Sequence, residues 1–163
     1  MGQRELLLTI GAIIIFSISS FSVNQLALRN SEAIYMQQAE FYAVKLAQQF
    51  IEEAKIKAFD ETTIVGNPVS IPSDFKSIPM GPEGGETYPN FDDVDDFNGF
   101  STSIATNIGA MTISLSVDYV NETDLDSVVT TQTFYKKMSV TVQSDYLTNL
   151  VTAHYVFAYQ KNP

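Results

Sequence analysis

Acidic side chains gather in one short stretch of the chain, and their chemistry suits a hard cation. Residues 90–100 read NFDDVDDFNGF, so pairs of aspartates are separated by an apolar residue and followed by an Asn-Gly turn signal. The spacing differs from that of an EF-hand loop, in which glycine follows three alternating ligands. Calcium binding is one interpretation, and a solvated loop whose side chains cap turns is the other. The candidate oxygen ligands for Ca²⁺ are Asp92, Asp93, Asp95, Asp96 and Asn98.

The other polar residues form no catalytic pattern. A second acidic turn contains Asn121, Glu122, Asp124 and Asp126, with a weaker case for a cation. The one histidine, His154, alternates with core residues on an expected strand and is interpreted as a surface residue. Since the chain has no cysteine, disulfides, thiolate metal sites and thiol nucleophiles are excluded. We expect no enzymatic activity and, calcium apart, no cofactor.

The net charge of −10 falls entirely on the second part of the chain. Residues 1–59 carry five basic and five acidic side chains, whereas residues 60–163 carry four basic and fourteen acidic ones. Phosphate binding requires a basic patch, and none is present. Nucleic acid is therefore not an expected partner, and the acidic part suits a solvated outer surface or cation binding.

An apolar stretch at the N-terminus must be covered by something other than water. Residues 1–23 read MGQRELLLTIGAIIIFSISSFSV, with no charge from Leu6 to Val23. Ten large apolar side chains at roughly 1.5–3 kcal/mol each amount to about 15–30 kcal/mol when buried, which exceeds the net stability of an ordinary domain. The uncharged run is at the lower limit of the length that spans a bilayer as a helix. We expect burial in lipid or against other copies of the chain.

The chain is predicted to be α+β, with one long helix followed by an antiparallel sheet. Apolar residues at steps of three or four continue beyond Val23, and neither proline nor glycine interrupts residues 12–64. We expect a helix over residues 1–58, apolar in its first half and amphipathic in its second, where residues 1–23 form the membrane or filament-core half. Residues 59–109 are rich in glycine and proline and predict loops. Residues 110–163 predict the sheet.

Alternation of apolar and polar residues indicates which side chains face the core. The second half of the helix is expected to pack its apolar stripe on one face of the sheet. That stripe is formed by Tyr35, Ala39, Tyr42, Leu46, Phe50 and Ala54. The inward strand positions are Ile113, Leu115, Val117 and Tyr119, then Met138, Val140 and Val142, then Val151, Ala153, Tyr155, Phe157 and Tyr159.

Several of these features resemble the type IV pilin and type II secretion pseudopilin superfamily. The apolar N-terminal helix carries a glutamate at position five and merges into an amphipathic helix, and residues 43–60 are similar to the helix end of many pilin-like proteins. Residues 91–100 are similar to the Asp-Asp-Val-Asp-Asp-Tyr-Asn-Gly segment of haemagglutinin-type minor pilins and some pseudopilins. The resemblance covers the first sixty residues and one loop.

The resemblance implies a filament subunit. Its helix would lie in the inner membrane before assembly and then be extracted by a secretion-type machine into a helical homo-oligomer at the cell surface. In that family the acidic residue at position five neutralises the N-terminal amine of a neighbouring subunit, a role that would fall to Glu5. The residues expected to take part in assembly are Met1, Arg4, Glu5, Leu6, Leu7, Leu8, Ile10, Ile13, Ile14 and Phe16.

Alternatives remain open at several points. Glu5 is in the family register if Met1 is the first mature residue, and at the third position if Gly2 marks a cleavage site; a leaderless relative that is never cut is a further option. Glu5 could also sit at the membrane interface, paired with Arg4. Ser20-Phe21-Ser22 is a poor secretory cleavage site. For the whole chain, the other interpretations are a minor pilin or pseudopilin, and a single-pass, membrane-anchored exported binding domain.

Overall fold

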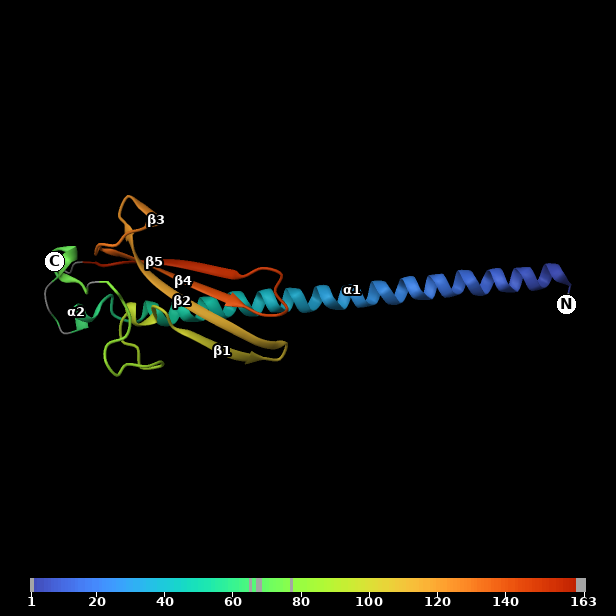
Figure 1. Cartoon of the computed structure of the whole chain (residues 1–163), viewed down its shortest axis with the longest axis horizontal. Coiled ribbons are helices and arrows are strands. Elements are labelled where there is room, and N and C mark those ends of the chain that lie inside the picture. The colour runs from blue at the N-terminus through green and yellow to red at the C-terminus, as the bar shows by residue number, and fades with distance from the viewer. Residues whose placement is uncertain (1, 65, 67–68, 77, 161–163) are drawn as a thin grey trace. The chain divides into compact units, whose positions relative to one another are not determined.

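The computed structural model describes residues 2–64, 66, 69–76 and 78–160 of the chain. The chain divides into two compact units, one extending to Gln38 and the other beginning at Ala39. The predicted α+β class is confirmed, since one long helix precedes a five-stranded antiparallel sheet (Figure 1). The elements are α1 (Gln3–Lys55), α2 (Glu61–Ile64), the 3₁₀ turns η1 (Pro72–Asp74) and η2 (Asp95–Phe97), and the strands β1 (Ser101–Thr106), β2 (Gly109–Asn121), β3 (Asp124–Val128), β4 (Tyr135–Gln143) and β5 (Val151–Ala158).

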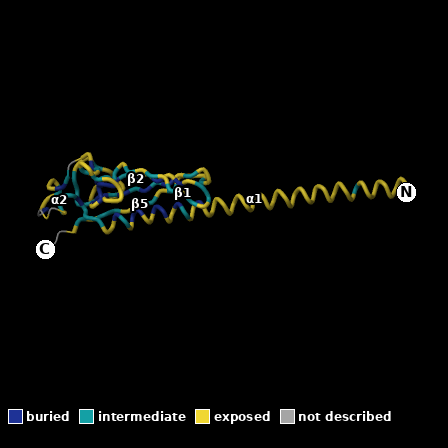
Figure 2. The backbone as a smooth tube through the Cα atoms, turned by 90° about the horizontal axis from the view of Figure 1, so that it is seen from below, coloured by how far each residue is buried: buried dark blue, intermediate teal, exposed yellow. Residues whose placement is uncertain are grey.

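In the second unit, one face of α1 is buried in the core. Small alanines allow the helix to approach the sheet closely, while Phe50 meets the rings of Tyr88 and Phe100 at about 6 Å between centroids. Phe41 lies on the solvent-facing side and is 68% exposed, which confirms that this half is amphipathic. The buried helix residues are Ala39, Ala43, Leu46, Ala47, Phe50, Ile51 and Ala54 (Figure 2).

The sheet has the strand order β1-β2-β4-β5, and β3 pairs with the end of β2. Val117 lies opposite Met138 in the β2–β4 register, and Met138 lies opposite Tyr155 in the β4–β5 register. The alternation predicted for β2 and β4 is confirmed, because every second side chain is buried. These inward residues and the buried face of α1 form one hydrophobic core.

Four local predictions differ from the structure. Tyr35 was expected on the stripe of the helix that packs on the sheet but is 52% exposed. Strand β1 begins at Ser101, inside the region predicted as loops, because Ser101–Thr106 pairs along β2. The expected turn at 121–126 is the tip of a hairpin, in which Asn121 pairs with Asp124. Tyr155 was expected in the core but is 37% exposed. It lies on edge strand β5, with the Lys55 ammonium 4.6 Å from its ring centroid.

Candidate functional site

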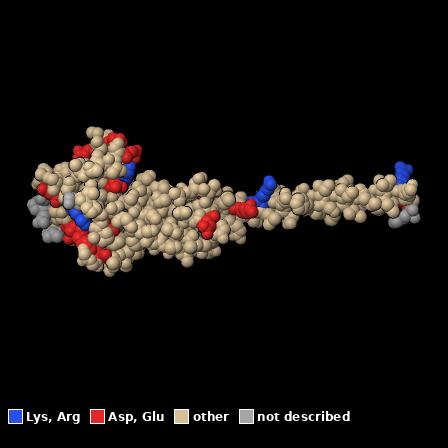
Figure 3. All heavy atoms as spheres, viewed as in Figure 1, with Lys and Arg blue, Asp and Glu red and all other residues tan. Residues whose placement is uncertain are grey.

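The first unit exposes a continuous set of large apolar side chains. Leu7, Leu8, Ile15 and Phe16 are each about two-thirds or more exposed. No residue is buried in the part of α1 that is apolar enough to cross a membrane, so this is a candidate membrane span and not a core helix. Seen as spheres, this part of α1 shows almost no charged atoms between its ends (Figure 3). The assembly residues of the sequence prediction all lie on this exposed stretch, except Met1, which is outside the described residues.

The exposed apolar stretch continues beyond Val23. Leu26 and Leu28 are about 60% exposed, and the next charged residue is Arg29. At 1.5 Å per residue, the uncharged run from Leu6 to Leu28 is roughly 34 Å long, against a hydrocarbon thickness of about 30 Å. By length alone, this uncharged run can span a bilayer, although it includes the polar Asn24 and Gln25.

Three hydroxyl groups of this stretch are satisfied within the helix itself. Thr9 donates to the carbonyl of Leu6 at 2.9 Å, and Ser17 and Ser22 donate to the carbonyls four residues before them. The Gly2 amide donates to Glu5 Oε2 at 3.2 Å, and no ion pair joins Arg4 to Glu5 among the described residues. In a dry environment the carboxylate of Glu5 and the guanidinium of Arg4 would require charged partners, and the side chains of Ser19, Ser20, Asn24 and Gln25 would require hydrogen-bond partners.

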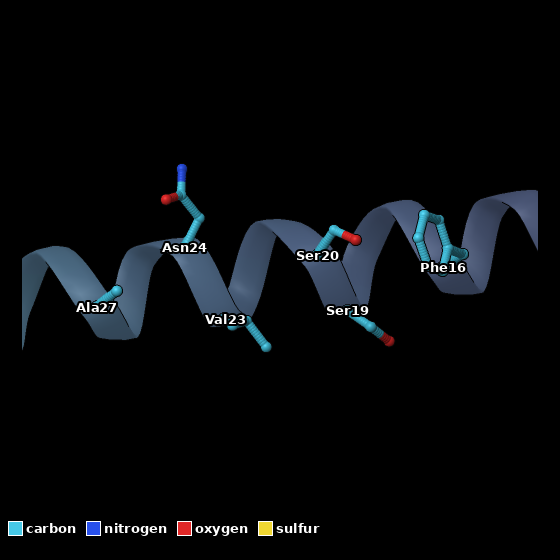
Figure 4. A pocket seen from close by; sticks show the side chains of 6 residues that line it. All are labelled: Phe16, Ser19, Ser20, Val23, Asn24 and Ala27. Atoms are coloured by element: carbon cyan, nitrogen blue, oxygen red, sulfur yellow. The ribbon is translucent and has the colours of Figure 1, made fainter.

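A shallow groove runs along one side of this helix. All its lining residues come from α1 and most are small, so the groove is open and suits the ridge of another helix (Figure 4). The lining residues are Phe16, Ser19, Ser20, Val23, Asn24 and Ala27.

The second unit contains a buried ionic cluster centred on Lys136 of β4. The Lys136 side chain is fully buried, and its ammonium donates to Phe59 O at 2.7 Å, Asp60 Oδ2 at 2.9 Å and Asp95 Oδ1 at 2.8 Å. These three bonds use all its protons and join the helix exit to η2 and to the sheet. Burial alone would raise the pKa of Asp60, but the charge of Lys136 and hydrogen bonds from Lys136 and Thr62 lower it below its ordinary value.

The acidic loop is folded by its own carboxylates. Asp93 Oδ1 accepts from the amides of Asp95 at 2.8 Å and Asp96 at 3.2 Å, and Asp96 Oδ2 accepts from the amides of Asp92 and Asp93. Asp93, Asp95 and Asp96 are fully buried, so the interpretation as a solvated loop is wrong even though the turn-capping role is present. Asn98 is also a positioning residue, because its amide binds the backbone of Met80 and Val117.

Three glutamates that the sequence analysis did not single out lie beside this loop. Carboxylate oxygens of Glu61, Glu83 and Asp93 lie within 4.8 Å of one another, as do those of Glu61, Glu86 and Asp92 and those of Glu83, Glu86 and Asp96. Asp95 instead faces the lysines, and the side-chain amide of Asn98 is bonded to the backbone of Met80 and Val117. Sequence spacing could not identify the glutamates, because they come from α2 and from the 81–86 turn.

Crowding of these carboxylates raises several of their pKa values. Burial, together with the charges of Asp95 and Asp96 and the side-chain interaction of the two carboxyl groups of Asp93 and Asp95, raises the pKa of Asp93 to about 9. Burial and the charges of Asp96 and Asp92 raise the pKa of Glu86 to about 7, and burial raises the pKa of Glu61 and of Asp96 as well. The cluster holds more negative charge than its lysines neutralise.

Comparisons of the chain with protein-family models, curated proteins and solved structures give no match. The arrangement of one long N-terminal helix and an antiparallel sheet is compatible with a pilin-like fold. Function is therefore inferred from the chemistry of the chain itself.

Proposed function

We propose that this protein is a structural subunit of a pilus-like filament at the cell surface. Its helices bundle through the apolar stretch from Leu6 to Leu28, and the acidic β domain faces outward. The observation that carries the proposal is the exposure of this stretch, in which large apolar side chains have no partner within the described residues. Such a surface is stable only in lipid or against other apolar helices.

Two features favour a helical bundle as the final environment. The groove lined by Ser19, Ser20 and Ala27 allows close approach of a second helix, which is the usual way in which apolar helices associate. Glu5 lies beside the apolar run, where a carboxylate is costly unless a cation is close. The terminal amine of a neighbouring subunit is the partner that we propose for it, in agreement with the resemblance to type IV pilins.

Before assembly, the same stretch would lie in the inner membrane. The hydroxyls of Thr9, Ser17 and Ser22 bond to carbonyls of their own helix, so these three groups stay paired on insertion. Extraction from lipid into a filament then requires a machine that supplies energy, and a secretion-type assembly system is the proposed partner.

Disulfide crosslinking tests the bundle directly, because the natural chain has no cysteine. Ser19→Cys and Ser20→Cys place a thiol of nearly the same size in the groove. We expect oxidation of intact surface fractions to give disulfide-linked dimers when either variant also carries a second cysteine one helical turn away (Ser19→Cys with Val23→Cys, or Ser20→Cys with Phe16→Cys), because neighbouring subunits of a helical filament are offset along its axis. The matched control is Ser127→Cys on the exposed strand β3, which we expect to stay monomeric.

Glu5→Ala tests the role of the carboxylate. We expect the variant to insert in the membrane normally and to yield few or no filaments by electron microscopy of sheared surface fractions. Normal filament numbers from this variant would remove the pairing role of Glu5. Wild-type cells without filaments, together with no crosslinks at positions 19 and 20, would instead support a membrane-anchored monomer. Sparse filaments that contain only a few copies of the chain would support a minor pilin or pseudopilin.

A further inference from the structure

Three loop segments meet at the end of the second unit where α1 stops. Residues 57–58 pair with residues 91–94, through the Ala58 amide to Asp92 O and the Val94 amide to Ala58 O, each at 3.0 Å. The 81–86 turn is attached through Lys76, which donates to Gly81 O at 2.5 Å and to the carboxylate of Glu83. These contacts bring the carboxylates of α2, of the turn and of the η2 loop together.

The carboxylates form three overlapping groups of possible ligands. Each of Glu61, Glu83 and Glu86 belongs to two of the groups, so the three groups are one connected cluster. Oxygen atoms within 4.8 Å of one another fit around one Ca²⁺ ion, because Ca–O distances are about 2.3–2.6 Å and opposite ligands are about twice that far apart. Mg²⁺ requires a tighter octahedron with distances of about 2.0–2.1 Å.

Four residues of this cluster carry buried oxygens without a hydrogen-bond partner among the described residues. Asp93 and Asp96 are fully buried, yet Asp93 Oδ2 and Asp96 Oδ1 accept no hydrogen bond from the described residues. The same holds for the second oxygens of Glu61 and Glu83. Buried carboxylate oxygens are nearly always paired, because leaving one unsatisfied costs about 1–3 kcal/mol or more. Several unpaired carboxylate oxygens in one place indicate a cation-binding site more directly than the acidic composition does.

The two lysines of the region do not supply that cation. The Lys136 ammonium is saturated by Phe59, Asp60 and Asp95. The Lys76 ammonium bonds to Gly81 and to the other oxygen of Glu83, and it lies 3.9 Å from Asp95. Both lysines thus serve one side of the acidic loop, and the unpaired oxygens of Asp93 and Asp96 have no ammonium partner.

We propose that this cluster is a calcium site that locks the three loop segments to one another. Its ligands are carboxylate oxygens alone, which suits a hard divalent cation and not zinc or copper. The ion would be held by Glu61, Glu83, Glu86, Asp92, Asp93 and Asp96. The site does not depend on the proposed filament function, since every ligand belongs to the second unit.

Calcium titration of the full chain in detergent, after treatment with a chelator, tests the site. We expect calorimetry to show binding of one ion, with MgCl₂ at least ten-fold weaker. At a free calcium concentration about 100-fold above Kd, the melting temperature by circular dichroism should rise roughly 5–10 °C. Absence of both binding and a thermal shift would overturn the proposal.

Two site variants and one control locate the ion. Asp93→Asn keeps Oδ1 for the amides of Asp95 and Asp96 and removes the charge, so it should fold in chelator with an unchanged or higher melting temperature and lose the calcium response. Glu61→Gln, at a partly exposed position, should weaken calcium binding at least ten-fold. Asp124→Asn, in the second acidic turn, should bind calcium like the parent. An unchanged calcium response in both site variants, or its loss in Asp124→Asn, would place the ion elsewhere and overturn the assignment.

Discussion

The two units of this protein depart from ordinary burial in opposite ways. The first exposes large apolar side chains such as Leu7 and Phe16, whereas the second buries Asp93, Asp96 and Lys136 completely. Both arrangements are costly for an isolated chain in water. The first presents apolar side chains without apolar partners among the described residues, and the second buries carboxylate oxygens that accept no hydrogen bond from them. The two proposals follow from this contrast, lipid or other helices for the first unit and a metal ion for the second.

The buried charged groups of the second unit form two neighbouring parts. One is the ionic cluster centred on the ammonium of Lys136, and the other is the group of carboxylates around Asp93. Around Lys136, every proton has an acceptor, so the lysine stabilises the fold through three hydrogen bonds. Around Asp93 the carboxylates face one another, and their pKa values rise. Replacing Lys136 should therefore lower the stability of the fold, whereas removing one carboxylate charge around Asp93 should not.

The largest expected effect comes from Lys136→Met. Loss of the ammonium leaves Asp60 and Asp95 buried without a cation, and breaking such a buried pair costs about 3–5 kcal/mol. Thermal unfolding of the full chain in detergent measures the loss. The neighbouring Lys137→Met is the control, because Lys137 meets an exposed Asp126 at 3.6 Å, and such surface pairs contribute about 0–1 kcal/mol. Equal losses from the two substitutions would contradict the buried network.

The next effect concerns the apolar unit. Ile14→Asp places a charge in the middle of the stretch from Leu6 to Leu28, at a cost of about 2.5–3.5 kcal/mol for a residue at the centre of a membrane helix. We expect a strong reduction of the membrane-bound fraction after an alkaline wash, and no filaments. Ser127→Asp on β3 adds the same charge to an exposed strand and should change neither measurement. Filaments from Ile14→Asp would show that this part of the helix is not in a dry bundle.

The pH dependence of the stability of the calcium-free protein tests the crowding of the carboxylates around Asp93. Asp93 and Glu86 have raised pKa values, so from about pH 5 to 8 the folded chain keeps protons that the unfolded chain has released. Stability is then lost as pH rises, by at most about 1.4 kcal/mol per pH unit for the buried Asp93 and by less for Glu86, which solvent screens. We expect the melting temperature in chelator to fall between pH 5 and 8, less so in Asp93→Asn. A parent protein whose melting temperature rises over this range would contradict the crowding of these carboxylates.

The smallest effect is expected where apolar exposure continues into the second unit. Phe41→Ser should change the free energy of unfolding by no more than about 0.5 kcal/mol, because Phe41 lies on the solvent face of α1. Phe50→Ala, about two and a half turns further on and therefore on the opposite face, removes a buried ring and should cost about 3–5 kcal/mol. Denaturant unfolding of both variants compares the two faces. A large loss in Phe41→Ser would show that this ring is buried, in contrast to its exposure here.

Periodicity along the chain was sufficient to predict the helix, its two halves and the inward residues of β2 and β4. Those patterns are local, because the 3.6-residue and two-residue repeats determine which side chains share a face. Tyr155 follows the same repeat but lies at the sheet edge, so the pattern alone misplaced it. Strand β1 was missed because it is short, rich in serine and threonine and never fully buried.

The sequence by itself determined that an apolar helix needs lipid or other helices, and that the acidic charge belongs to the rest of the chain. It also pointed to the loop at residues 92–96 as a possible cation site. Only the tertiary structure decided which oxygens converge there. It brings Glu61, Glu83 and Glu86 to the loop. It also shows that Asp95 binds the Lys136 ammonium and that the Asn98 side chain binds the backbone. The physical reason is that a cation site depends on distances between segments far apart in the chain, which residue spacing does not record.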